Sequence, residues 1–396
     1  MKKLLTTIIL LLATFALAAC DGYEDYADDH AAATTTPIPT PDPTPEPSPL
    51  APLPSPRPSP TPGPTPEPEP ELPPSTGRIF LFGEAHGNQA TMLRQIEIWG
   101  DFYHNYGMRH LFVELPYFAA QFLNMWMQAD DDTILYELFE DWRGTAAHTT
   151  YKLDFYRAIK RDFPETVFHG NDVGHQSNTT GQRFLEHLRD NGLQGTPSYY
   201  LTLESMAQFT RFHNANSHAV RAYYKPRNFI RAFDALVDQD VMAIHGMGHV
   251  LEDAYFLGME GVDTMATTLR LRYGDQLETF DMTGYARTMA IRIEVITIGD
   301  TEFYATFYGK DYGSFVTPSG RVVGREFWRV HDAYEHFATS SLNGNVLPLI
   351  NFIMYVELGE VLVVDIHMEN GDVRRTYYRT SGRIWNNMPV AEEFLP

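Results

Sequence analysis

The strongest constraint on the fold is a pattern repeated through residues 78–284, where short apolar runs alternate with helical stretches. Each run ends in glycine, proline or other turn residues before the next helical stretch begins. The pattern predicts strands at residues 78–82, 109–116, 166–172, 240–249 and 277–282. Alternating strands and helices are typical of βαβ units, so we expect an α/β fold with a mostly parallel sheet and helices on both faces.

The segments between these runs have helical spacing, and the pattern changes after residue 284. Helices are expected at residues 88–106, through most of 117–164, and at 179–192, 200–238 and 262–273. Residues 291–298, 302–308, 361–368 and 373–378 alternate as strands instead, and Asn370 and Gly371 form a good hairpin turn. We therefore expect residues 285–396 to form a C-terminal antiparallel β-rich addition on a core of residues 77–284.

Acidic residues and histidines gather at the ends of the predicted strands. Right-handed crossovers bring these ends to one edge of a parallel sheet, where ligands bind. The residues expected there are Glu84, His86, Glu114, His169, Asp172, His245 and His249. The alternatives are that Glu84 caps the next helix, that His86 is a surface residue, and that His169 and His245 are core histidines.

The first residues predict export. Lys2 and Lys3 precede an apolar run over residues 4–17, and small residues follow, which is typical of a secretory signal peptide over residues 1–19. Cys20 is the only cysteine in the chain. Its position resembles the bacterial lipobox, which implies cleavage before Cys20 and lipid attachment there. The protein is then expected outside the cytoplasm, anchored to the bacterial cell membrane. The alternative is an ordinary export signal.

Residues 20–76 predict a linker. They begin with an acidic stretch and continue in a proline-alternating tract over residues 37–74. Such a tract favours polyproline II at about 3.1 Å per residue, a stiff tether able to span on the order of 100 Å. The chain has a net charge of −21 and no basic stripe. Nucleic acid is therefore not an expected partner.

The chemistry expected at the sheet edge is the activation of water. The sequence has no Gly-x-Ser-x-Gly elbow and no His-Glu-x-x-His motif, and Cys20 is assigned to the anchor. His86 could take a proton from water, with Glu84 or Glu114 holding the imidazole tautomer. Arg221 and His249 could stabilise the oxyanion. Asp172, Asn228 and His245 are candidate binding residues.

Residues 78–284 resemble the superfamily that joins erythromycin esterases, ChaN-type haem-binding lipoproteins and Tiki-type proteases. The matching motifs are Gly83-Glu-Ala-His-Gly87, Val113-Glu114, the Arg-x6-Asn spacing of Arg221 and Asn228, Ile244-His-Gly-Met-Gly-His249, and Leu269-Arg-Leu-Arg-Tyr-Gly274. The resemblance to the esterases implies that His86 is the base and Glu114 assists it, while Arg221 and His249 match later functional residues. It implies a hydrolase of an ester or related acyl bond in a small molecule, with no required cofactor.

Two alternatives come with the same resemblance. A Tiki-like protease would place a divalent metal on His86, Glu114 and His249 to generate hydroxide. A ChaN-type lipoprotein would bind haem through an axial histidine, tyrosine or methionine in an apolar cleft.

Overall fold

The computed structural model describes residues 73–284, 289–311, 315–317, 320–347, 356–385 and 388–396. The predicted signal peptide, Cys20 and residues 37–72 of the proline-alternating tract lie outside these ranges. At the predicted domain boundary, residue 284 is described and residues 285–288 are not. Within the described residues, no helix has both the length and the apolar character needed to cross a membrane.

A parallel sheet organises the N-terminal part of the described chain, which confirms the predicted α/β fold. Its five strands lie in the order β3-β2-β4-β1-β5. They are β1 (Ile79–Glu84), β2 (His110–Pro116), β3 (Val167–Asp172), β4 (Val241–Gly246) and β5 (Leu277–Asp281). The central strand β4 pairs with β1 and β2, so that Gly83 lies beside His245 and Val113 beside Ile244.

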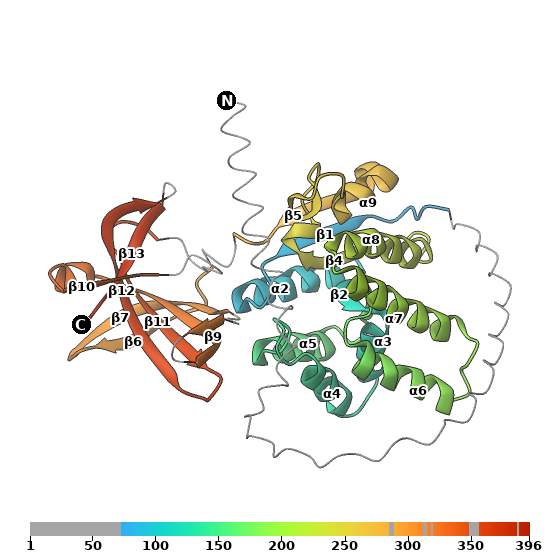
Figure 1. The fold of residues 1–396 in the computed structure, drawn as a ribbon, viewed down its shortest axis with the longest axis horizontal. Coiled ribbons are helices and arrows are strands. Elements are labelled where there is room, and N and C mark those ends of the chain that lie inside the picture. The colour runs from blue at the N-terminus through green and yellow to red at the C-terminus, as the bar shows by residue number, and fades with distance from the viewer. Residues whose placement is uncertain (1–72, 285–288, 312–314, 318–319, 348–355, 386–387) are drawn as a thin grey trace, which may run out of the picture.

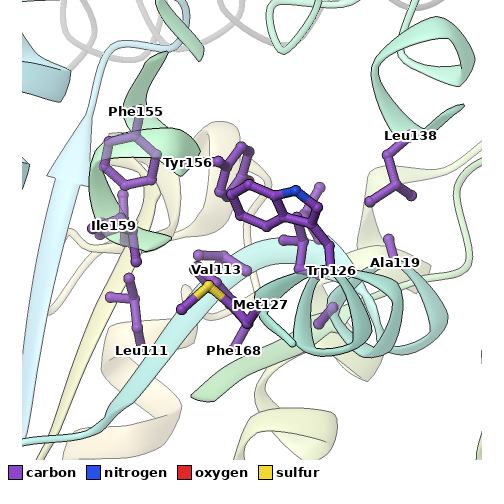
Figure 2. Packing of buried hydrophobic residues seen from close by; sticks show 14 of the residues in the cluster. Leu111, Val113, Ala119, Trp126, Met127, Leu138, Phe155, Tyr156, Ile159 and Phe168 are labelled. Atoms are coloured by element: carbon purple, nitrogen blue, oxygen red, sulfur yellow. The ribbon is translucent and has the colours of Figure 1, made fainter. Parts of the chain in front are cut away.

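Helices cover both faces of this sheet (Figure 1). Alternate residues of β1 divide between two cores, because neighbouring side chains of a strand point to opposite faces. Phe80 and Phe82 join the core beneath α2 (Gln89–Asn105), α3 (Tyr117–Met127), α4 (Thr133–Asp141), α5 (Thr150–Asp162) and α6 (Gln182–Asp190). Figure 2 shows part of this core, where α3 and α5 pack over β2 and β3. Ile79 and Leu81 join the core beneath α8 (His218–Asp234) and α9 (Met265–Tyr273).

One predicted helix is wrong in its extent. The stretch expected at residues 200–238 is two helices, α7 (Pro197–Ala215) and α8. Asn216 separates them with a left-handed backbone at φ 42°, a conformation that ends a helix and that asparagine adopts more readily than most residues. Short turns complete this part: η2 (Ser177–Gly181), η3 (Met247–His249), η4 (Phe256–Gly258) and η5 (Gly274–Gln276).

An antiparallel sheet forms the C-terminal part, as the sequence predicted. Its path among the described residues is β10-β13-β12-β11-β9-β7-β6, with β8 paired to β9. The elements are β6 (Arg292–Ile298), β7 (Thr301–Asp311), β8 (Phe315–Thr317), β9 (Gly320–Val330), β10 (Leu342–Val346), β11 (Val361–Met368), β12 (Val373–Trp385) and β13 (Met388–Phe394), with helix α11 (Tyr334–Phe337). A β-bridge between Asn88 and Asp311 joins this sheet to the start of α2.

Candidate active site

The turn after β1 holds Glu84 and His86 in a fixed arrangement. Glu84 is the last residue of β1, and its Oε1 lies 3.0 Å from Nδ1 of His86. Its other oxygen accepts a hydrogen bond from the buried Gln95 amide. Asn88 caps α2 by accepting from the backbone N–H of Thr91 at 2.9 Å, so the alternative role of Glu84 as the helix cap is wrong. The carboxylate is instead free to orient the imidazole.

His86 is the most accessible side chain of this group. Its side chain is 27% exposed, against 7% for Glu84 and 10% for Glu114. Its Nε2 lies 3.6 Å from Oε2 of Glu114. Burial lowers the pKa of His86, but the charge of Glu114 and the hydrogen bond to Glu84 outweigh it, so the pKa is raised from 6.5. A histidine held between two carboxylates is a stronger base than a free one.

Glu114 lies at the centre of the site, and the other charged and polar side chains surround its carboxylate. It lies within β2, and its Oε2 accepts a hydrogen bond from the backbone N–H of Gly246 at the end of β4. Its Oε1 accepts from the Arg221 guanidinium at 2.7 Å and from the Lys225 ammonium. Burial raises the pKa of Glu114, but the charge of Lys225 and its other neighbours hold the pKa well below the usual 4.5. Glu114 is therefore ionised at neutral pH.

Helix α8 supplies both cations, one helical turn apart. Arg221 also donates to Asp172 at the end of β3, through Nε at 3.0 Å. Lys225 has a fully buried side chain and lies 3.8 Å from the same carboxylate. Burial would raise the pKa of Asp172, but Arg221 and Lys225 lower it far below its ordinary value. Buried charges require such pairing. Together these groups bind the ends of β2 and β3 to α8.

His249 lies on η3, directly after β4. Its Nε2 is 3.2 Å from Oε1 of Glu114, and its ring stacks on Phe256 with centroids 4.5 Å apart. Burial lowers the pKa of His249 to about 4, and the charge of Lys225 adds to this shift. The imidazole is therefore neutral at neutral pH and presents no permanent charge to the site.

Two predicted binding residues lie behind the site, around Asn171. The Nε2 of His245 lies 2.9 Å from the Asn171 side-chain oxygen, and the side-chain amide of Asn228 donates to the Asn171 carbonyl at 3.2 Å. His245 is fully buried, and burial holds its pKa well below 6.5. His169 is not at the site: it lies inside β3 and its Nε2 is 3.0 Å from Nδ1 of His110.

The structure thus brings Glu84, His86, Glu114, Arg221 and His249 together, with Asp172 alongside. The sequence analysis missed Lys225 and Gln95. For Lys225 a signal was present, because it follows Arg221 at the spacing of one helical turn and shares its face. For Gln95 there was no such signal, since a glutamine on a helix is usually a surface residue.

The same residues do not fit the predicted divalent-metal site. Among the described residues, no group of three or more histidine, cysteine, aspartate or glutamate side chains is arranged to hold a metal ion. Glu114, which the metal alternative requires as a ligand, already receives Arg221 and Lys225. Two fixed cations at the ligand oxygen oppose a divalent ion by charge repulsion. Haem binding stays a prediction.

Comparisons with known proteins give structural neighbours only. No family model matches the chain. No curated protein matches it either.

A mutant erythromycin esterase in its open conformation shares 11% identity over 62% of this chain and 78% of its own, with a TM-score of 0.38. A Bacillus cereus protein shares 11% identity over 52% of this chain and 66% of its own, with a TM-score of 0.37. A succinoglycan biosynthesis protein shares 10% identity over 52% of this chain and 65% of its own, also with a TM-score of 0.37. The chain spans just under two thirds of the last two structures. An erythromycin esterase is thus among the neighbours, as the resemblance predicted.

Proposed function

We propose that this protein is a hydrolase in which His86 activates a water molecule to cleave an ester or related acyl bond. The observation that carries the proposal is the position of the His86 imidazole: Glu84 lies 3.0 Å from its Nδ1, Glu114 lies 3.6 Å from its Nε2, and the side chain is 27% exposed. General bases in enzymes are oriented in this way, with one ring nitrogen fixed by a carboxylate and the other free to take a proton.

The reaction follows from this geometry. Nε2 of His86 takes a proton from water as the oxygen attacks the acyl carbon, giving a tetrahedral intermediate with a negative oxygen. The intermediate collapses by breaking the acyl–oxygen bond, and His86 returns its proton to the leaving alkoxide. The products are a carboxylic acid and an alcohol. Glu84 stabilises the imidazolium that forms between these steps, and Glu114 lies close enough to share that task at 3.6 Å.

We place this activity outside the cytoplasm. The signal peptide of residues 1–19 and the lipobox-like position of Cys20 support export and lipid anchoring, and the proline-alternating tract supports a catalytic part held away from the membrane. Mass spectrometry of the protein from bacterial membranes tests the anchor. A lipid-modified Cys20 at the amino terminus is expected, and an unmodified mature protein in the medium would contradict it.

A hydrolysis screen tests the activity. The full-length protein in detergent is incubated with macrolactones, simple esters and peptides, beside His86→Ala and the matched control His336→Ala, which removes an exposed histidine of α11. We expect turnover of at least one ester, a loss of about 10²–10⁴-fold in His86→Ala, as for other general bases, and no loss in the control. Equal turnover in all three proteins would overturn the proposal.

A further inference from the structure

One more cation lies beside the site, on α5. The N-terminal turn of this helix packs against the turn that carries His86, because the Tyr151 hydroxyl donates to the Gly87 carbonyl at 2.7 Å. Lys152 is the next residue. Burial lowers its pKa, and the charges of Glu84 and Glu114 oppose that shift, so its ammonium lies within electrostatic reach of both carboxylates.

Lys152 differs from the other cations around the site in its contacts. Its ammonium lies 4.9 Å from the ring of Phe155 and 5.3 Å from that of Tyr156, and it makes no hydrogen bond or ion pair in the described part of the chain. The two rings point into the core beneath α5 (Figure 2), so Lys152 lies on the inner side of the helix, half-buried. Arg221 and Lys225, in contrast, both donate to carboxylates.

We propose that Lys152 binds a negatively charged oxygen of the substrate at the catalytic centre. Water attack at His86 creates such an oxygen, and the cations on α8 are already neutralised by Glu114 and Asp172. A half-buried ammonium needs no rearrangement to receive this charge, and it acts more strongly there than it would in bulk water. The oxygen is either the developing oxyanion of the acyl group or a carboxylate that the substrate carries. This inference rests on the proposed hydrolase function.

The test uses full-length Lys152→Met and Lys152→Arg. The control is Lys160→Met, which changes another lysine of α5, whose ammonium donates to the Trp126 and Ala129 carbonyls. Substrates are p-nitrophenyl acetate and mono-p-nitrophenyl succinate, and methylphosphonate serves as a tetrahedral anion. For Lys152→Met we expect a loss of about 10²–10³-fold in kcat, as for a lost oxyanion donor, with weaker binding of methylphosphonate. Lys152→Arg should recover part of both. The control should keep both, even if it melts earlier.

The outcomes separate the two sources of charge and the two proposals. An equal loss on both esters assigns Lys152 to the developing oxyanion, and a larger loss on the succinate ester assigns it to a substrate carboxylate. If Lys152→Met hydrolyses both esters and binds methylphosphonate as the wild type does, the role of Lys152 is overturned. If the wild type cleaves no ester, the hydrolase function fails, and calorimetry with methylphosphonate decides for Lys152: weaker binding in the variant supports it, and equal or absent binding overturns it.

Discussion

At the scale of single residues, Gly246 determines how closely His86 can approach Glu114. A Cβ at this glycine would lie 2.7 Å from Nε2 of His86 and 3.5 Å from Oε2 of Glu114. The backbone at Gly246, with φ −55° and ψ 140°, is one that alanine adopts without strain. The glycine is therefore required by the space that the imidazole occupies, and not by its own conformation.

Gly246→Ala should consequently lower the proposed hydrolase activity without unfolding the protein. The added methyl group displaces His86 from its position, and a misplacement of about 1 Å can cost about 10²-fold in rate. The measurement is kcat/KM on the best ester from the screen, together with circular dichroism of the variant. Full activity in a well-folded variant would show that the position of His86 relative to Glu114 does not matter for catalysis.

Glu84→Gln should move the pH dependence of the reaction. Glu84 and Glu114 raise the pKa of His86 above 6.5, so the base is active only above that raised value, and the acid limb of kcat/KM should lie above pH 6.5. Glutamine keeps an acceptor for Nδ1 but removes a negative charge that stabilises the imidazolium. The pKa of His86 then falls, and the acid limb should shift to lower pH. A shift to higher pH would contradict this assignment of the base.

The site residues could be predicted from the sequence where they lie at or just after the end of a strand. Glu84, His86 and Glu114 follow apolar runs, and the topology of a parallel sheet brings such positions to one edge. Lys152 was not predictable in this way, because a lysine on a helix usually faces solvent. Only the packing of α5 against the sheet shows that its side chain turns inward, whereas the spacing of Lys225 from Arg221 was a signal in the sequence.

At the scale of elements, the ion pairs of Glu114 join α8 to the parallel sheet. Lys225 lies in the middle of α8 with no exposed side-chain surface, and it donates to Glu114 on β2. Pairing a buried cation in this way gives little net stability, but removing one partner leaves the other charged and unsolvated. The contact therefore fixes the position of α8 relative to the residues of the candidate active site.

A double-mutant cycle should reveal this coupling. Glu114→Ala should lower the free energy of unfolding by about 3–5 kcal/mol, since it removes the carboxylate that accepts from the buried Lys225 ammonium and leaves Asp172 3.8 Å away. Adding Lys225→Met should restore much of that loss, because the uncompensated charge is removed. Urea unfolding followed by tryptophan fluorescence measures all four proteins. Additive losses in the double variant would mean that the two side chains do not interact.

Element boundaries could be predicted where local signals set them. The strands of the parallel sheet were expected within a few residues of their positions, because glycine and proline end each apolar run. The break at Asn216 was missed, since α7 and α8 are both helical in pattern. Strand β9 was missed because Gly324, Arg325 and Glu326 interrupt its alternation. Arg325 is nevertheless buried against Asp311, a pairing that only the folded sheet provides.

At the scale of the whole molecule, buried and half-buried histidines of lowered pKa should make the stability of the fold sensitive to acid. Burial lowers the pKa of His175 and His249 to about 4 and that of His169 to about 3. Below pH 6.5 the unfolded chain binds protons at these residues while the folded chain does not. Glu114 and Asp172, whose pKa values are depressed, lose their stabilising effect only at still lower pH. His86 acts in the opposite direction, because its pKa is raised.

Stability should therefore fall as the pH drops from about 6.5 to about 4, the interval between the unfolded and folded pKa values of His175 and His249. The melting temperature measured between pH 7.5 and 4.5 checks this expectation. His245→Gln, which removes another buried histidine of lowered pKa, should flatten the curve. A melting temperature that stays constant or rises on acidification would contradict the prediction.

The position of β4 has a consequence for how the chain matures. This strand lies at the centre of the parallel sheet, yet it is made after β1, β2 and β3, and β5 follows it. The neighbours of β1 in the sheet, β4 and β5, are therefore synthesised long after β1 itself. Strand β1 has no partner strand until more than half of the described chain has been made. Until β4 is made, the strand that lies between β1 and β2 is missing, so the parallel sheet that brings His86 to Glu114 cannot be completed.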